Sequence, residues 1–487
     1  MQQINRDILK LAIPSILANI TIPIVGMVDI AVAGHLDTNA ATMIGGIAIG
    51  SMLFDLLYWN FGFLRVGTGG LAAQAYGRQD SRECARILAR ALGISLGIAL
   101  CLLLIQWIFV KAAFLVVDCT PQVRELAEQY FFIRIWAAPA TLSLMALKGW
   151  FIGMQDSVSP MVVDFVVNGM NVLMSIVLAL GLTLPSVSDP TSSTVIIPAI
   201  GFSGIAAGTV IAQWSGLVTA LLIVAFKYRR AVFAGFGVSE FRGLFKGSET
   251  RRFFVMNADL FVRSLCFIAI YIGFTVISAR YGDVLLAVSS IMMKILMIFS
   301  YFTDGFAYAG EAMTGRYIGA KDRPRLVKTV KWTFVWSMGI AVIFMGIYHF
   351  AGVPLLRMMT SDAVVVDASR DFLPWLLLMP VVGCAAFTWD GIFIGATGSR
   401  EMRNSMLWSV VAFAGVWIAG ILLLNSFGTS LPGAGPDMTS SPVQSGVTSS
   451  PTPYGVAAMH ILMAAYFAHL LARTIYLTIR SPRIYVF

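Results

Sequence analysis

A single carboxylate lies inside an apolar stretch near the start of the chain. Residues 22–37 read IPIVGMVDIAVAGHLD, and Asp29 has no Lys or Arg near it along the sequence. If this stretch crosses a membrane, the charge costs roughly 2.5–3.5 kcal/mol on insertion scales, and residues of this kind commonly serve ion or proton movement. We therefore expect Asp29 to bind a proton or a cation.

A second polar group recurs at helical spacing further along the chain. Asp164, Asn168, Asn171 and Ser175 are separated by four, three and four residues, so one face of a helix carries all four. Their oxygens suit a hard cation such as sodium, and together with Asp29 they predict an ion or proton site. The alternative is that these side chains only hydrogen-bond neighbouring helices, as Asn and Ser commonly do in membranes.

Further charges interrupt the apolar stretches. They are Lys148, Asp259, Arg263, Asp304, Glu311 and Asp390. Asp259 and Arg263 are four residues apart and are predicted to pair on one helix face. Each of the other charges is either neutralised by a partner or used in an ion path or in coupling between parts of the protein. The long side chain of Lys148 could instead reach the membrane surface.

The composition that surrounds these residues indicates a membrane protein. Of the 487 residues, 58% are hydrophobic and 12% are charged, whereas a soluble domain has about 25% charged residues. Twelve apolar stretches are long enough to cross a bilayer, which takes about 20 residues. They are 10–35, 42–66, 88–115, 128–152, 160–184, 200–226, 254–279, 285–310, 330–352, 371–396, 404–427 and 455–479. No cleavable signal peptide is expected, because no A-x-A site is found near the first stretch.

The basic excess follows membrane topology. The net charge is +9, and with the N-terminus inside, the inner segments hold 24 Lys and Arg, the outer loops 5 and the spans 5. This bias predicts that both termini are cytoplasmic and that the basic charge is not a nucleic-acid-binding patch. The five Cys and four His have no metal-ligand spacing, and no G-x-S-x-G, Walker A or dinucleotide motif occurs. We expect no enzymatic activity, no metal and no cofactor, apart from a coupling ion, H+ or Na+.

The second half of the chain repeats the first. GWFIGMQDS at 149–157 corresponds to GIFIGATGS at 391–399, an offset of 242, and GGLAAQAYGRQD at 69–80 corresponds to EAMTGRYIGAKD at 311–322 at the same offset. Two halves with an even number of spans have parallel topology and are related by a pseudo-two-fold axis along the membrane normal. This repeat favours a transporter that rocks one half against the other over a receptor, a structural protein or a membrane enzyme.

The predicted fold is therefore an all-α polytopic membrane protein with twelve transmembrane helices in two six-helix lobes. The first lobe is 1–226, the second is 253–487, and a basic cytoplasmic linker, 227–252, joins them. The repeat also serves as an internal control for the polar residues. At the offset of 242, Asp29 corresponds to Tyr271, and the four polar residues of the stripe correspond to Met406, Val410, Phe413 and Trp417. Only the first half is thus predicted to hold the ion site.

Several stretches, in order along nearly the whole chain, resemble the multidrug and toxic compound extrusion (MATE) transporters, and specifically the DinF branch. They are IPSILANITIPIVGMVDIAVAGHLD (13–37), FLRVGTGGLAAQAYG (63–77), GWFIGMQDS (149–157), FVRS (261–264), DGFAYAGEAMTGRYIGAKD (304–322) and DGIFIGATGSREMRNSM (390–406). The resemblance implies two lobes in a V, with one cavity that opens alternately to each side. It also implies export of organic cations or other amphiphiles, driven by inward movement of protons or sodium.

By the same resemblance, Asp29 matches the essential acid of the first helix, Asn171 matches an asparagine of the cation site, and Thr209 matches a threonine of the sixth helix. The family often has aspartate four residues after that asparagine, where this chain has Ser175. A proton and sodium therefore both remain open as the coupling ion. The runner-up function is a flippase for lipid-linked or oligosaccharide substrates, for which clustered cavity arginines and extra helices would be expected.

The expected partners are small amphiphilic or cationic molecules and the lipid bilayer, without nucleic acid. The protein is expected to be a monomer in a bacterial inner membrane. The stretch 428–453 is rich in Ser, Pro and Thr and is predicted to be an exposed, flexible insertion.

Overall fold

Helices make up nearly all of the computed structural model. It describes residues 2–21, 26, 28, 29, 31–33, 40–115, 117, 119–185, 193–229, 248–360, 362–428 and 451–486. The helices are α1 (Gln2–Ile20), α3 (Ala40–Trp59), α4 (Phe63–Gly77), α5 (Ser81–Ala113), α6 (Pro121–Arg134), α7 (Ala138–Gly153), α8 (Val158–Leu180), α9 (Phe202–Lys227), α12 (Ser248–Ala279), α13 (Asp283–Gly319), α14 (Arg323–Met359), α15 (Ala363–Arg370), α16 (Leu373–Gly395), α17 (Ser399–Gly428) and α18 (Pro453–Arg480), with short 3-10 turns η1 (Asn60–Gly62), η2 (Ile135–Ala137) and η3 (Ser481–Tyr485).

The all-α polytopic membrane fold is confirmed. Within the described residues, 11 helical segments are long and apolar enough to span a bilayer, and each coincides with one of the predicted spans. The remaining predicted span, 10–35, includes residues that the structure does not describe. Most of the predicted insertion 428–453 and most of the linker 227–252 also lie outside the described residues.

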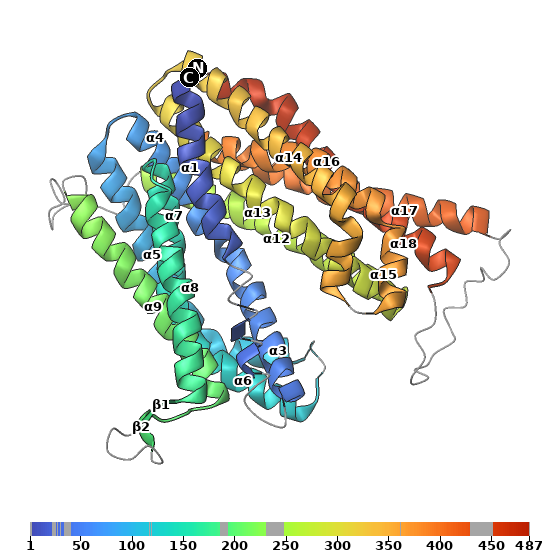
Figure 1. Cartoon of the computed structure of the whole chain (residues 1–487). Coiled ribbons are helices and arrows are strands. Elements are labelled where there is room, and N and C mark those ends of the chain that lie inside the picture. Colours follow the sequence, from blue (N-terminus) through green and yellow to red (C-terminus); the bar gives the residue numbers. More distant parts are fainter. Residues whose placement is uncertain are drawn as a thin grey trace.

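One loop contains structure that the sequence did not predict. Residues after α8 form an antiparallel hairpin of β1 (Leu182–Pro185) and β2 (Ser193–Ile197), with Leu182 opposite Ile197. The β-branched run Val195–Ile197 favours a strand, but it is too short to distinguish from loop by periodicity alone. The hairpin lies at the tip of the molecule, away from both chain ends (Figure 1).

Two helical bundles give the molecule the shape of a V. Helices α3–α9 form one bundle and α12–α18 form the other; they meet near the two chain ends and diverge from there (Figure 1). Helix α1 runs between them. Its residues Ile4, Ile8 and Leu11 share a hydrophobic core with Phe306 and Met313 of α13. The first helix therefore packs directly on the second bundle.

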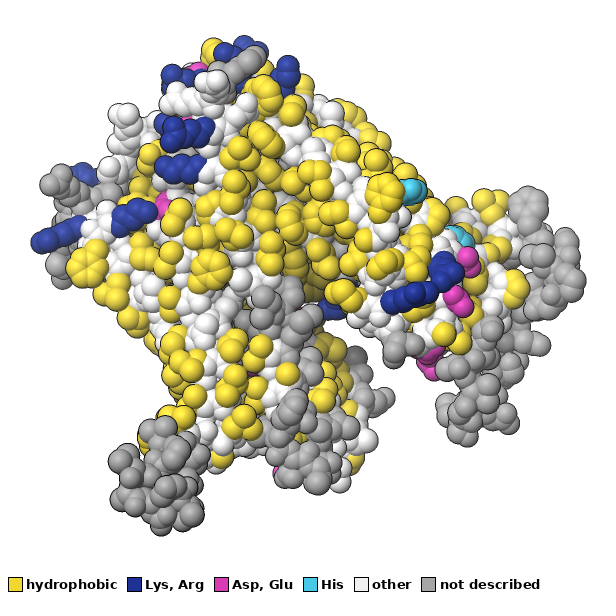
Figure 2. All heavy atoms as spheres, viewed as in Figure 1, with side chains coloured by type: hydrophobic (Ala, Val, Ile, Leu, Met, Phe, Trp, Pro, Cys, Tyr) yellow, Lys and Arg dark blue, Asp and Glu magenta, His cyan; other side chains and the backbone are white. Residues whose placement is uncertain are grey.

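The closed end of the V depends on close contact between α4 and α13. A Cβ added at Gly77 would lie 2.0 Å from the carbonyl oxygen of Arg316, and one added at Gly319 would lie 2.1 Å from that of Gln74. These glycines are equivalent in the repeat, so the two helices cross symmetrically with backbone against backbone. Figure 2 shows Lys and Arg gathered toward this end and hydrophobic side chains over the flanks.

Candidate functional site

The polar residues of α8 are brought to α9 by small side chains. Helix α9 begins with FSGIAAG, and a Cβ added at Gly208 would lie 2.6 Å from the backbone nitrogen of Ser175. Small residues at such spacing let two membrane helices approach closely. As a result, Asn171 and Ser175 lie against the face of α9 that carries Thr209.

Four of the predicted site residues form one buried cluster. The hydroxyl of Ser175 donates to Oδ1 of Asp29 at 3.1 Å, and the amide nitrogen of Asn171 donates to Oγ1 of Thr209 at 2.9 Å. Asp29 is 6% exposed and Ser175 is fully buried. Oδ1 of Asn171 is buried and has no hydrogen-bond partner among the described residues. The cluster thus offers one carboxylate and one free amide oxygen to an incoming ion.

The rest of the predicted polar stripe lies elsewhere on α8. Asn168 donates to the hydroxyl of Thr21, just past the end of α1, and Asp164 pairs with Lys148 of α7. With a helical rise of about 1.5 Å per residue, Asp164 lies about 16 Å from Ser175 along the helix. The stripe is therefore divided. Asn171 and Ser175 lie beside Asp29, whereas the charge of Asp164 is taken up by Lys148.

A basic residue that the sequence did not connect with Asp29 lies within its electrostatic reach. The charge of Arg134, at the end of α6, acts on Asp29. The guanidinium donates to the hydroxyls of Tyr130 at 3.1 Å and Ser51 at 3.4 Å. Asp29 is therefore far from positive charge along the sequence but not in the folded structure. Nothing in the local pattern around Arg134 indicated this relationship, because it depends on how α6 packs in the bundle.

The predicted pair of Asp259 and Arg263 is wrong. Asp259 accepts hydrogen bonds from Arg403 at 2.6 Å and from the hydroxyl of Ser399 at 2.9 Å, both on α17. Arg263 pairs with Asp390 on α16 instead. Spacing along one helix shows that two charges can meet, but packed neighbouring helices offer other partners, and those contacts prevailed here.

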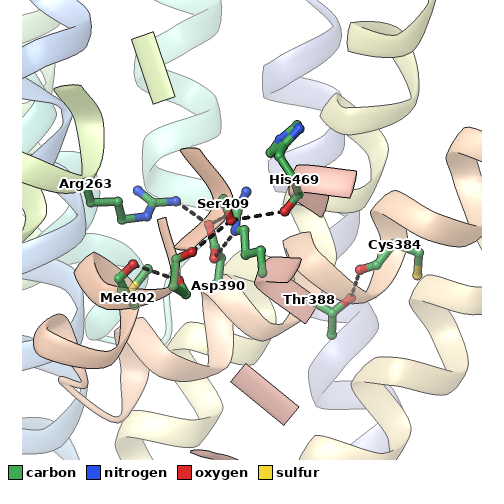
Figure 3. A network of polar contacts seen from close by, with 9 residues as sticks. Arg263, Cys384, Thr388, Asp390, Met402, Ser409 and His469 are labelled. Carbon is green, nitrogen blue, oxygen red and sulfur yellow. Dashed lines mark hydrogen bonds and ion pairs between the residues drawn. The ribbon is translucent and has the colours of Figure 1, made fainter. Parts of the chain in front are cut away.

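The sequence interpretation also missed Arg473, which was counted among the 24 Lys and Arg of the inner segments. Its side chain is 2% exposed inside α18, and its Nε donates to Oδ1 of Asp390 at 2.9 Å. Asp390 therefore lies between two arginines, and Figure 3 shows Arg263 and Asp390 directed toward each other, with the ring of His469 pointing away. The position of Arg473 inside the predicted span 455–479 was the sequence signal that could have identified it as a buried charge.

Comparison with known proteins identifies the family. Residues 14–177 and 260–422 match the family model MatE, one block in each half of the chain. The chain belongs to the MatE family. DNA damage-inducible protein F of Escherichia coli (strain K12) is 33% identical over 84% of both chains. A probable multidrug resistance protein NorM of Photorhabdus laumondii is 23% identical over 86% of both.

Solved structures share the fold of this MatE-family transporter. A crystal structure of MATE in the bent conformation has a TM-score of 0.78 at 13% identity and covers 99% of this chain and 97% of its own. An outward-facing multidrug resistance MATE family transporter of the MOP superfamily has a TM-score of 0.77 at 14% identity, with coverage of 99% and 96%. The predicted MATE resemblance is confirmed, and the protein is a transporter rather than an enzyme.

The two bundles of this MatE-family transporter are joined by polar contacts at the closed end. Arg65 of α4 pairs with the fully buried Glu311 of α13 at 3.3 Å. The amide of Gln74 donates to the carbonyl of Gly395 at 3.0 Å, and the amide of Gln155 donates to the carbonyl of Ala312 at 2.7 Å. Glu311 was a candidate on the sequence, whereas both glutamines were missed.

Asp304 lies in the electrostatic field of three arginines, Arg65, Arg263 and Arg473. These cations come from α4 of the first bundle and from α12 and α18 of the second, so both bundles contribute positive charge around Asp304. The three cations are balanced by Asp304, Asp390 and Glu311, so the cluster as a whole is neutral when all six groups are ionised.

An apolar pocket of about 460 Å³ lies beside the divided stripe. It is lined by Thr21 and by the α8 residues Phe165, Asn168, Gly169, Val172, Leu173 and Ile176. A mostly hydrophobic wall with few polar groups is typical of sites for organic molecules. Asn168, in the wall of this pocket, is three residues before Asn171 of the Asp29 cluster on the same helix.

Proposed function

We propose that the protein is a secondary active efflux antiporter that exports organic cations or amphiphiles in exchange for protons. The observation that carries this proposal is the buried contact of Ser175 with Asp29 beside the amide oxygen of Asn171. The repeat counterparts of these three residues are Trp417, Tyr271 and Phe413, so the second half cannot offer the same oxygens. A titratable group confined to one bundle suits a coupling site.

The proposed lobes are 1–226 and 253–487, with the linker 227–252 and both termini in the cytoplasm of a bacterial inner membrane. In this orientation the closed, basic end faces the cytoplasm and the V opens to the outside. An outward-open cleft is the state in which the external ion would reach Asp29. The two bundles would then tilt about the contacts of α4 and α13 to open the other side.

The proposed coupling step is neutralisation of Asp29. While ionised, the carboxylate is stabilised by Ser175 and by the charge of Arg134. Protonation removes the charge, so the segment that carries Asp29 can repack against α8 and reduce the adjoining pocket, which releases substrate outward. Exchange of one proton for a monovalent cation moves no net charge, so the proton concentration gradient drives it; each further proton that enters per substrate moves one net charge and adds about 2.3 kcal/mol per 100 mV.

Sodium is the alternative coupling ion. A hard cation prefers several oxygen ligands, with charge supplied by carboxylates. The cluster has one carboxylate and otherwise neutral oxygens, because Ser175 stands where the family often has aspartate and Asp164 is paired with Lys148. This donor set favours a proton over sodium.

A flippase for anionic, lipid-linked substrates is the second candidate function. The observation that favours it is the group of Arg65, Arg263 and Arg473, which could receive a phosphate. The three acids that balance these arginines argue against it, because Asp390 already holds both Arg263 and Arg473. The multidrug names of the relatives, such as NorM, also support drug export as the first choice.

Transport in proteoliposomes tests the proposal. The purified protein would be reconstituted, and efflux of a fluorescent organic cation would be followed with a proton gradient or a sodium gradient imposed separately. We expect a proton gradient alone to drive transport and Asp29→Asn to abolish it. Transport driven only by a sodium gradient would show that the coupling ion is sodium and not a proton. Scrambling of a lipid-linked oligosaccharide without cation transport would support the flippase.

A further inference from the structure

A basic pocket lies where α12 and α17 begin. Its lining includes none of the residues of the Asp29 cluster and none of the arginines around Asp304. Its volume is about 770 Å³, and its lining includes Arg251, Arg252 and Arg400. All three arginines are exposed. The spans that begin here start at Thr250 and Ser399, so the pocket lies at the level where two membrane helices enter the bilayer.

The carboxylates at this pocket are already engaged by other residues. Glu401 accepts from Arg483 at 2.6 Å and from the hydroxyl of Tyr476 at 3.0 Å. Asp259, one helical turn after the pocket residue Val255 on α12, accepts a hydrogen bond from Arg403 at 2.6 Å. Within the described part of the chain, no ion pair joins a carboxylate to any of the three pocket arginines. The pocket therefore carries a surplus of positive charge.

An apolar surface adjoins this positive charge. Phe254 and Val255 follow the two arginines on α12 and are 50% and 42% exposed, and Val255 also lines the pocket with the buried Met256. A ligand that fits both features has an anionic head and an apolar tail. Basic pockets between transmembrane helices at the cytoplasmic side bind the head groups of anionic lipids.

We propose that this pocket binds the phosphate head group of an anionic phospholipid from the cytoplasmic leaflet. The choice of leaflet rests on the orientation proposed above. The arginines would contact the phosphate, and the acyl chains would lie along Phe254 and Val255. Arginine suits this role because its planar group of donors matches phosphate oxygens.

The pocket belongs to the second half alone. At the repeat offset of 242, Arg251, Arg252 and Arg400 correspond to Leu9, Lys10 and Val158. A basic surface made only by the positive-inside bias needs no such clustering, because any cytoplasmic loop can carry the charge. Lys10 keeps the positive charge of Arg252, whereas Leu9 and Val158 are apolar, so Arg251 and Arg400 add charge that the first half lacks at these positions and that a ligand would use.

The pocket also touches the contact between the two bundles. The hydroxyl of Thr397 lies 3.2 Å from Nη2 of Arg252 and 3.2 Å from Nε2 of Gln74, and both nitrogens donate to it. Gln74 is on α4 of the other bundle. A head group that binds Arg252 therefore competes with Thr397 for this guanidinium, and Thr397 is the residue that contacts the other bundle through Gln74. Bound lipid is thus expected to alter the rate at which the closed end opens.

Lipid retention tests the site without relying on transport. The protein would be mixed with micelles that contain phosphatidylglycerol and phosphatidylcholine, and the lipids that remain bound would be counted by native mass spectrometry. We compare the triple variant Arg251→Gln, Arg252→Gln, Arg400→Gln with a control that loses the same charge at the start of α14, namely Arg323→Gln, Lys328→Gln, Lys331→Gln. These control residues are also exposed.

We expect the pocket variant to lose affinity for phosphatidylglycerol by about tenfold or more, since each basic residue near an anionic head group contributes to binding, and the control to keep it. Equal loss in both variants, or no loss in either, would overturn the proposal. Competition with inorganic phosphate separates the two sources of a phosphate. Tight binding of phosphate alone, with displacement of the lipid, would assign the pocket to a soluble ligand instead.

A transport arm connects the site with function. Initial export rates would be measured in vesicles of phosphatidylcholine with and without phosphatidylglycerol. We expect anionic lipid to change the rate of the wild type and of the control variant, and to leave the pocket variant unaffected. Equal lipid response in all three proteins would overturn the link to the closed end. Failure of export in every protein, with selective lipid retention intact, would reject the proposed function and not the site.

Discussion

The guanidinium of Arg65 lies 3.3 Å from the carboxylate of Glu311, across the boundary between the two bundles. Glu311 is fully buried, and Arg65 also lies over the ring of Tyr308 at 4.4 Å. A cross-bundle ion pair of this kind has to separate if the closed end of the V opens. Its strength therefore bears on both the stability of this state and the rate of leaving it.

Replacing Glu311 with Gln should weaken the closed end. The change leaves the charge of Arg65 without its partner, and loss of one member of a buried pair costs about 3–5 kcal/mol. We expect a lower thermal midpoint and greater labelling of cysteines placed at the closed end of the V. The matched control is Glu128→Gln, which removes an exposed pair with Arg124 inside one bundle. Unchanged labelling in Glu311→Gln would show that the pair does not hold this end closed.

Asp29→Asn should abolish gradient-driven export and leave folding intact. Asn has nearly the same shape and can still accept the hydrogen bond from Ser175, but it cannot release and take up a proton. Efflux of a fluorescent cation from energised vesicles measures the loss, and size-exclusion chromatography checks folding. Asp164→Asn is the control for loss of an acid in the same bundle, and it is expected to lower stability because Lys148 loses its partner. Wild-type efflux by Asp29→Asn would refute the coupling role.

Asn171→Ala should weaken coupling, and Phe413→Ala should not. The amide oxygen of Asn171 has no hydrogen-bond partner among the described residues, so it is free to contact an ion or a proton-carrying water. Phe413 occupies the equivalent position of the second half. The quantity to compare is substrate moved per proton taken up by the vesicles. Equal effects of both substitutions would mean that this position serves packing in each half.

Ser175→Asp distinguishes the two coupling ions. A second carboxylate beside Asp29 repels its charge, so a proton is held to higher pH and the pH profile of export shifts upward. If sodium is the coupling ion, the added carboxylate instead provides a ligand and strengthens the sodium dependence. Export would be measured against external pH and external sodium for both proteins. We expect the shift in pH; a strong sodium requirement in the wild type, without a pH shift in the variant, would exclude the proton mechanism.

Asp156, in the turn between α7 and α8, should stabilise the protein only above acidic pH. Burial acts to raise the pKa of Asp156, but hydrogen bonds from Lys227, Ser159 and Tyr228 outweigh it and hold this pKa below the usual 3.8. A lowered folded-state pKa stabilises the protein above the unfolded-state pKa, and this contribution is lost as the pH falls through the folded-state value.

Asp156→Asn is therefore expected to cost about 1 kcal/mol or more at neutral pH. The difference in thermal midpoint from the wild type should shrink as the pH falls below about 3.8, the ordinary value. The matched control is Asp367→Asn, since Asp367 is an exposed residue in α15. A difference that stays constant down to the acid limit would mean that the carboxylate charge contributes nothing here.

Much of the membrane architecture could be predicted from the sequence because it depends on local composition. A run of about 20 apolar residues spans a bilayer whatever it packs against, and the repeat at an offset of 242 is visible in the letters themselves. The spacing of Asn171 and Ser175 placed them on one helix face for the same reason, since helical periodicity is a property of a single segment. The acid Asp29 stood out because a buried charge is costly anywhere in a membrane.

The identity of each charge's partner was decided by tertiary structure. Arg263 pairs with Asp390 rather than with Asp259 four residues away. Arg473 lies inside the second bundle, where it binds Asp390, rather than in an inner segment outside the spans. The cost of a buried charge requires a partner but does not say which helix supplies it, because several sites of opposite charge satisfy the same need. Only the packing of the helix faces against one another selects among them.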